Sequence, residues 1–209
     1  MSFNDIWLSE SEKDWNQLLK TYWGRILEDN IQIEYELNRL TPNQIKNMNA
    51  DEWYQFLLKK YFVWKYTAKN RLATSTNNLK KYAENNELEQ LHYIKNEILA
   101  LDKTDILNSL EVACKIRGLG VAGASGLLSL LYPRDFATVD QFVVKALREV
   151  DEYKDKVKNM RPENLSLDDG VVLTNIMRKK SAEMNAKFST SFWGPRTLEM
   201  ALWAYREKK

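Results

Sequence analysis

The stretch that decides the fold is DILNSLEVACKIRGLGVAGASGLLSLLYPRDFATVD, residues 105–140. Its centre, GLGVAG at residues 118–123, matches the dinucleotide-binding pattern G-x-G-x-x-G. A nicotinamide or flavin enzyme of that kind needs a buried strand before the first glycine and further parallel strands beyond it. Apolar residues before Gly118 instead recur at helical spacing, and only residues 136–139 read as a core strand. The glycines are therefore predicted to join two helices, with exposed backbone N–H groups facing an anion.

Helix start signals recur along the whole chain. They are Ser9 (with Glu12), Thr41, Asn49, Thr104 or Asp105, Asp140, Ser166 and Pro195. The first would open a helix over residues 10–29, and Ser166 one that ends near Phe188. Residues 67–78, rich in Asn, Thr and Ser, are predicted to form a loop. Since no convincing alternation of period two occurs, the sequence predicts an all-α protein.

Composition restricts the function classes. The single cysteine, Cys114, excludes a disulfide framework and a thiolate-held iron–sulfur cluster, and the single histidine, His92, excludes a histidine-rich metal site. Neither a membrane span nor an export signal is recognisable, so we expect a cytoplasmic protein with no membrane partner. The net charge is only +2, so affinity for nucleic acid would require local clustering of the 31 Lys and Arg residues.

The glycine turn resembles that of the helix-hairpin-helix DNA glycosylases, the superfamily of endonuclease III, adenine glycosylase and 8-oxoguanine glycosylase. Residues 116–120, IRGLG, are similar to the family turn L-P-G-V-G. Ala124, Pro133 and the pair Val139-Asp140 follow in the family's order, with about twenty residues between the second glycine and the aspartate. The resemblance covers roughly residues 105–150.

This resemblance implies two helical subdomains with a DNA-binding cleft between them. Residues 45–135 would carry the hairpin, residues 106–132, and residues 1–44 would join residues 136–209 in the second subdomain. It also implies a monomer that binds double-stranded DNA containing a modified base, with Asp140 as the catalytic residue. The implied DNA-binding residues of the hairpin are Arg117, Gly118, Leu119, Gly120, Ala122 and Gly123. The only cofactor implied is a monovalent cation, K⁺ or Na⁺, under the turn.

One departure from the family bears on the reaction. Members that also cut the strand carry a lysine two residues after the second glycine, and this lysine attacks the sugar C1′ to form a Schiff base. The corresponding residue here is Ala122. The resemblance therefore implies a monofunctional enzyme without lyase activity. Arg117 replaces the usual proline of the turn, and Gln141-Phe142 replace the residues that commonly follow the aspartate.

Asp140 has two interpretations. Cleavage of an N-glycosidic bond builds positive charge on the deoxyribose, and a carboxylate near C1′ stabilises that charge and orients the attacking water. An aspartate before a helix is also a common N-cap with no further role. The hairpin in register with Asp140 favours catalysis.

A base flipped out of the duplex needs a pocket with aromatic walls. The aromatic run of residues 53–66 and the polar segment after it supply the candidates, which are Trp64, Lys65, Tyr66 and Arg71, together with Gln141. Arg196 and Lys208 are optional phosphate contacts. The leading hypothesis is a monofunctional DNA glycosylase of repair, or of defence against modified phage DNA, and the alternative is a catalytically inactive helix-hairpin-helix module that binds DNA.

Overall fold

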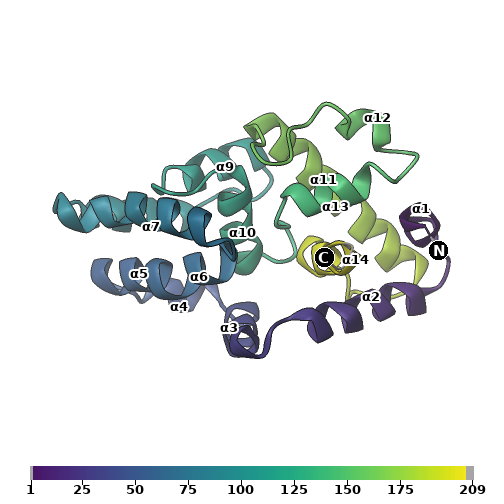
Figure 1. The fold of residues 1–209 in the computed structure, drawn as a ribbon, viewed down its shortest axis with the longest axis horizontal. Coiled ribbons are helices and arrows are strands. Elements are labelled where there is room, and N and C mark those ends of the chain that lie inside the picture. The colour runs from purple at the N-terminus through teal and green to yellow at the C-terminus, as the bar shows by residue number, and fades with distance from the viewer. Residues whose placement is uncertain (1, 206–209) are drawn as a thin grey trace.

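The computed structural model describes residues 2–205, and these form helices and connecting segments without any strand. The dinucleotide alternative therefore lacks its sheet in this part of the chain. Two groups of helices lie side by side along the longest axis, with α10 between them (Figure 1). The bounds are α1 Phe3–Trp7, α2 Glu12–Arg25, α3 Glu28–Asn38, α4 Pro42–Lys46, α5 Ala50–Phe56, the π-helical η1 Leu57–Tyr61, α6 Phe62–Lys65, α7 Lys69–Glu84, α8 Leu88–Leu99, α9 Ile106–Cys114, α10 Val121–Leu131, α11 Gln141–Leu147, α12 Lys154–Val157, α13 Leu167–Lys187 and α14 Pro195–Tyr205.

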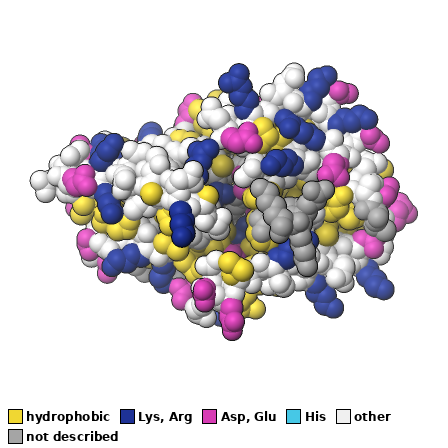
Figure 2. All heavy atoms as spheres, viewed as in Figure 1, with side chains coloured by type: hydrophobic (Ala, Val, Ile, Leu, Met, Phe, Trp, Pro, Cys, Tyr) yellow, Lys and Arg dark blue, Asp and Glu magenta, His cyan; other side chains and the backbone are white. Residues whose placement is uncertain are grey.

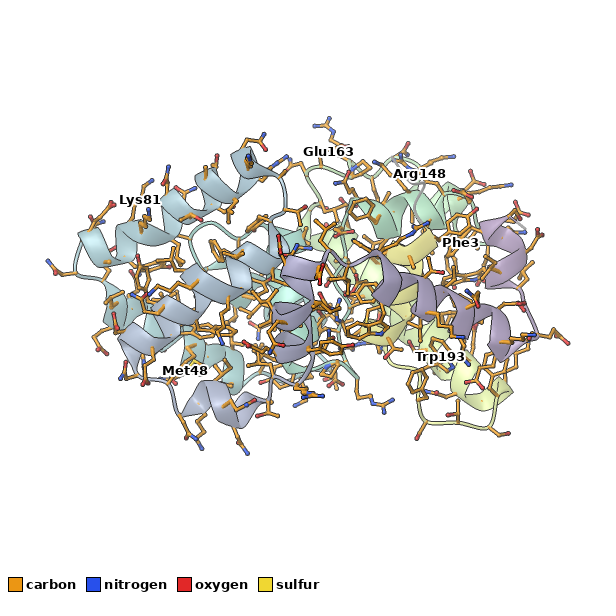
Figure 3. All side chains as sticks on the ribbon, turned by 60° about the horizontal axis from the view of Figure 1, so that its bottom comes forward. Phe3, Met48, Lys81, Arg148, Glu163 and Trp193 are labelled. Atoms are coloured by element: carbon orange, nitrogen blue, oxygen red, sulfur yellow. The ribbon has the colours of Figure 1, made fainter. Side chains whose placement is uncertain are left out.

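Buried apolar side chains gather in two large clusters and one small one. One large cluster runs from Leu37 to Phe136 along the chain. The other joins residues of α1 and α2 to Val121 and to residues 137–202. In Figure 3, Met48 and Lys81 mark the end of the molecule built by the first group, and Phe3 and Trp193 mark the opposite end. The third cluster, of Tyr22, Met200 and Ala204, lies where α2 packs on α14.

Most predicted helix starts are confirmed. Capping boxes begin α4, α5 and α13, Asp105 caps α9, and Pro195 begins α14. The box predicted at Ser9 is wrong, because α2 begins after Ser11 and the Ser9 hydroxyl donates to the Asp14 carboxylate, 2.6 Å away. The predicted helix over residues 10–29 is also two helices, since Ile26 and Leu27 are extended.

The predicted loop at residues 67–78 is wrong as well. Residues 69–84 form the helix α7, whose side chains Ser75, Leu79 and Tyr82 are buried on one face. Burial of this face outweighs the turn preference of the polar residues around it, because most helical stability in proteins comes from packing. The Tyr82 hydroxyl also donates to the Lys115 carbonyl oxygen at 3.0 Å, which ties α7 to the hairpin.

The segment expected to be extended, residues 136–139, runs along α10 without forming a strand. Two serines of α10, one turn apart, hold it. The Ser125 hydroxyl accepts from the Val139 N–H at 3.0 Å, and the Ser129 and Thr138 hydroxyls lie 3.1 Å apart. All four side chains are buried, so α10 fixes the position of the next residue, Asp140.

Candidate active site

The turn between α9 and α10 needs its first glycine. Gly118 has a φ of +94°, and a Cβ there would overlap the Ser75 carbonyl oxygen and lie 3.1 Å from the Phe62 ring. The Tyr66 hydroxyl donates to the Gly118 carbonyl oxygen at 3.0 Å, and Leu119 is buried beneath the turn. The hairpin is therefore braced by α6 and α7 and by the segment between them, which the sequence did not indicate.

The beginning of α10 is exposed at Gly120, whereas Val121 and Gly123 are buried and Ala122 is half-buried. Its N-cap, Gly120, is exposed, has open space around it and provides no side-chain cap. The N–H groups of Val121, Ala122 and Gly123 lie in the first turn, where N–H groups have no intrahelical partner. This end can accept a phosphate oxygen through the backbone.

The cation implied by the resemblance stays a prediction. Backbone carbonyl oxygens would have to ligate it, and two of them already accept hydrogen bonds from tyrosine hydroxyls, Lys115 from Tyr82 and Gly118 from Tyr66. A third, that of Ile116, accepts from the Leu119 N–H at 3.0 Å.

Arg117 is held within the protein. Its guanidinium forms an ion pair with Glu87 and stacks on the Tyr82 ring, 4.3 Å from the centroid. Glu87 raises the pKa of Arg117, and Arg117 in turn lowers the pKa of Glu87. The Arg117 side chain is 33% exposed, so a phosphate would share the guanidinium with Glu87.

Asp140 is the N-cap of α11, as predicted. Its Oδ1 accepts from the Phe142 N–H at 2.9 Å, and its Oδ2 lies 3.2 Å from Nζ of Lys65 on α6. The two side chains are 17% and 9% exposed, so the carboxylate is partly open to solvent and the ammonium is nearly enclosed. Asp140 therefore does more than cap a helix: its second oxygen faces a charged group from a distant part of the chain.

Asp140 and Lys65 line a cavity of about 380 Å³. Its aromatic lining residues are Tyr22, Trp64, Phe142 and Trp203, and its other lining residues are Arg25, Ile26, Leu27, Asn30, Glu34, Thr67, Thr138, Arg196 and Glu199. Trp64 and Lys65 were predicted for the base pocket and do line the cavity. Tyr66, Arg71 and Gln141 are not among its lining residues: Tyr66 braces the hairpin and Arg71 is exposed on α7.

A second hollow, of about 540 Å³, lies beside α3, α4 and η1. Gln32, Tyr35, Arg39 and Lys60 are among its lining residues, and none of the predicted site residues is. The smaller cavity is the candidate site because it contains the aspartate.

A buried charged cluster forms one wall of the Asp140 cavity. Arg196 donates to Oε1 of Glu34 at 3.0 Å and to the Glu199 carboxylate. Glu34 also accepts from the Tyr22 hydroxyl and from the Trp64 indole N–H. Burial, together with the nearby Asp140 charge, raises the pKa of Glu199.

This cluster corrects one prediction and adds residues that sequence reasoning missed. Arg196 is only 4% exposed and lies in an ion-pair network, so the structure does not place it where it could contact phosphate. Lys208, the other optional contact, lies outside the described residues. Glu34, Glu199 and Trp203 were not predicted. The only sign of this cluster in the sequence was that a basic residue, Arg196, and an acidic residue, Glu199, stand three positions apart.

Basic side chains lie near this region of the fold. On the face shown in Figure 2, Lys and Arg gather over the upper part, where α11 and α12 lie, with acidic side chains among them. This part of the chain carries Lys145, Arg148, Lys154, Lys156, Lys158 and Arg161. The same stretch carries Glu149, Asp151, Glu152 and Asp155, and Lys154 and Lys158 pair with Asp151 and Asp155, so this surface is mixed in charge.

Comparisons with models of protein families, with curated proteins and with solved structures find no match to this chain. None of the helices in residues 2–205 has the length and apolar character needed to span a membrane. Within the same residues, no cluster of three or more His, Cys, Asp or Glu side chains is arranged to hold a metal ion.

Proposed function

We propose that this protein is a DNA N-glycosylase that hydrolyses the bond between deoxyribose and a damaged or modified base flipped out of the duplex. One observation carries the proposal: the Asp140 carboxylate, fixed by α10 and α11, opens into a cavity with aromatic walls. A carboxylate enclosed in packing would have contradicted it. The two large apolar clusters support the division into two helical subdomains, with DNA lying between them.

Asp140 would act on the sugar. Departure of the base leaves an oxocarbenium-like deoxyribose, and the free side of Oδ2 stabilises its positive charge and orients the attacking water. Oδ1 is already occupied by the Phe142 N–H, which fixes the direction of the carboxyl group. The Lys65 ammonium partly neutralises this charge, so the sugar must share the carboxylate with it or displace it.

The cavity would hold the flipped base. Flat aromatic side chains such as Trp64, Phe142 and Trp203 suit the faces of a base, and hydrogen-bonding groups of the Glu34–Arg196–Glu199 cluster suit its edges. The volume, about 380 Å³, is within the range of pockets that bind small organic molecules. The cavity does not by itself select one base, so alkylated purines, oxidised purines and bulky phage pyrimidines are all to be tested.

The hairpin would hold the DNA backbone. The N-terminus of α10, exposed at Gly120, would offer first-turn N–H groups to a phosphate, and Ser125 and Ser129 on the same helix hold the segment that ends at Asp140. Phosphate contact at one end of α10 would thereby set the position of the sugar relative to the carboxylate.

The test is base release from a panel of modified oligonucleotides and phage DNAs, with alkali to reveal abasic sites. The decisive variant is Asp140→Asn, which keeps the cap acceptor and removes the charge. Asp105→Asn is the matched control, because Asp105 also caps a helix, accepting from the Asn108 N–H at 3.0 Å, and does not line the cavity. We expect base release to fall by about 100-fold or more in Asp140→Asn and to change little in Asp105→Asn.

Two outcomes contradict the proposal. Equal loss in both variants would mean that Asp140 acts only as a helix cap. A wild-type protein that binds DNA and releases no base from the panel would support the alternative, a helix-hairpin-helix module without catalysis. Which base is released also decides between repair and defence against modified phage DNA.

A further inference from the structure

Lys65 reaches the predicted catalytic aspartate from a distant part of the chain. It is the last residue of α6, seventy-five positions before Asp140, and its Nζ lies 3.2 Å from Oδ2. Both residues line the cavity, and the Lys65 ammonium is the hydrogen-bond partner of Asp140 Oδ2 in the described part of the chain. Any sugar carbon that approaches this oxygen also approaches the Lys65 nitrogen.

A glycine of α10 makes room for this lysine. A Cβ on Gly126 would lie 3.3 Å from Cδ and 3.5 Å from Cε of Lys65. The aliphatic part of the lysine therefore passes directly over the backbone of α10. The same Cβ would lie 2.8 Å from the Tyr61 hydroxyl, so a larger residue at position 126 would displace both Tyr61 and Lys65.

We propose that Lys65 forms a Schiff base with C1′ of the abasic deoxyribose, which gives this protein a lyase activity in addition to base removal. The inference rests on the proposed function, because it takes the product of base release as its substrate. It revises the expectation drawn from Ala122, since the amine comes from α6 instead of the hairpin. Lysine amines form such imines readily with aldehydes.

The reaction balances without a cofactor. The Lys65 ammonium passes one proton to Oδ2 of Asp140, and the amine adds to the C1′ aldehyde of the ring-opened sugar. The carbinolamine hydroxyl takes this proton and leaves as water, so an ammonium and an aldehyde become an iminium ion and one water molecule. The positive charge of the iminium ion remains opposite the Asp140 carboxylate, which stabilises it.

Strand cleavage follows from the iminium ion. Loss of a C2′ proton to water forms the C2′–C3′ double bond, and the C3′–O bond breaks with departure of the 3′ phosphate. Water then hydrolyses the imine and returns Lys65 to its ammonium form. The products are a 3′ unsaturated aldehyde and a 5′ phosphate.

The experiment uses an oligonucleotide that already contains an abasic site, so it does not depend on which base the protein removes. The full-length protein is incubated with this DNA and sodium borohydride, which reduces the imine to a stable amine adduct. The test variant is Lys65→Arg, which keeps the positive charge beside Asp140. The control is Lys60→Arg, because Lys60 lies five positions earlier, is 51% exposed and pairs with Glu36.

We expect a covalent adduct with the wild-type protein, and peptide mass spectrometry should place it on Lys65. The adduct and the nick at the abasic site should fall at least about 10-fold in Lys65→Arg and stay within about two-fold in Lys60→Arg. An adduct on another lysine, or no adduct from a protein that binds the abasic DNA, would overturn the inference. Base release with no Lys65 adduct would refute this inference alone. An adduct without any base release would refute the glycosylase proposal alone.

Discussion

Arg196 is the residue whose removal tests the charged wall of the cavity most directly. The variant Arg196→Met keeps most of the side-chain volume and removes the guanidinium. That guanidinium is the charge shared by Glu34 and Glu199, whose side chains are 7% and 6% exposed. Hydrogen bonds to charged groups contribute about 1.5–3 kcal/mol each, and breaking a buried ion pair from one side costs about 3–5 kcal/mol. We therefore expect the free energy of unfolding to fall by about 4 kcal/mol at pH 7.

Urea unfolding followed by tryptophan fluorescence measures this loss, and the Trp64 ring, 5.2 Å from the guanidinium, reports on the site. The matched control is Arg161→Met, because Arg161 is exposed. It should change stability by no more than about 0.5 kcal/mol. A loss below about 1 kcal/mol in Arg196→Met would refute the reasoning, since the two carboxylates would then not depend on Arg196.

The pH dependence provides a second readout of the same variant. The pKa of Glu199 is raised in the folded protein, so the folded state binds more protons than the unfolded state above the ordinary value of 4.5. The contribution of Glu199 to the free energy of unfolding therefore decreases as the pH rises above 4.5. Removal of Arg196 raises the folded pKa further, so the penalty of Arg196→Met should be smaller at pH 5 than at pH 7.

Three further predictions concern other parts of the site. Gly118→Ala should destabilise the protein by at least about 1–2 kcal/mol in urea unfolding, because a Cβ at a φ of +94° would meet the Ser75 carbonyl; an unchanged midpoint would contradict the hairpin geometry. Gly126→Ala should lower borohydride trapping on abasic DNA several-fold, because the added Cβ would lie 2.8 Å from the Tyr61 hydroxyl and 3.3 Å from Cδ of Lys65 and would displace both; Lys65 trapping at the wild-type level would show that the glycine is not needed. Burial raises the pKa of Cys114 to about 11, so its alkylation by iodoacetamide at pH 8 should be about 100-fold slower than that of a free thiol, and equal rates would contradict the burial.

The sequence was sufficient where local chemistry decides the structure. Capping residues such as Asp105, Asp140 and Ser166 place helix starts because their side chains bond to N–H groups two or three residues away. It was insufficient where distant segments decide. Residues 67–78 were predicted as a loop because their polar composition gives no sign of the core that covers one face of α7.

The candidate site divides in the same way. Asp140 and the hairpin could be proposed from one continuous stretch, because about twenty residues separate the second glycine from the aspartate. The cavity could not be proposed from the sequence, since Glu34, Lys65 and Arg196 come from three helices distributed over most of the chain. Periodicity shows that these helices exist and does not show which of their faces meet.

The composition of α10 connects fold and chemistry. Small residues here serve two purposes: Ser125 and Ser129 hold the segment before Asp140, and Gly126 leaves room for Tyr61 and for Lys65 to cross the helix. A lysine at position 122 would supply an amine from α10 itself, as in the family that the hairpin resembles, and would not require Gly126. An amine supplied from α6 instead requires a helix that another side chain can cross. The proposed amine is therefore one that α6 supplies across Gly126, and trapping on abasic DNA with Lys65→Arg tests it.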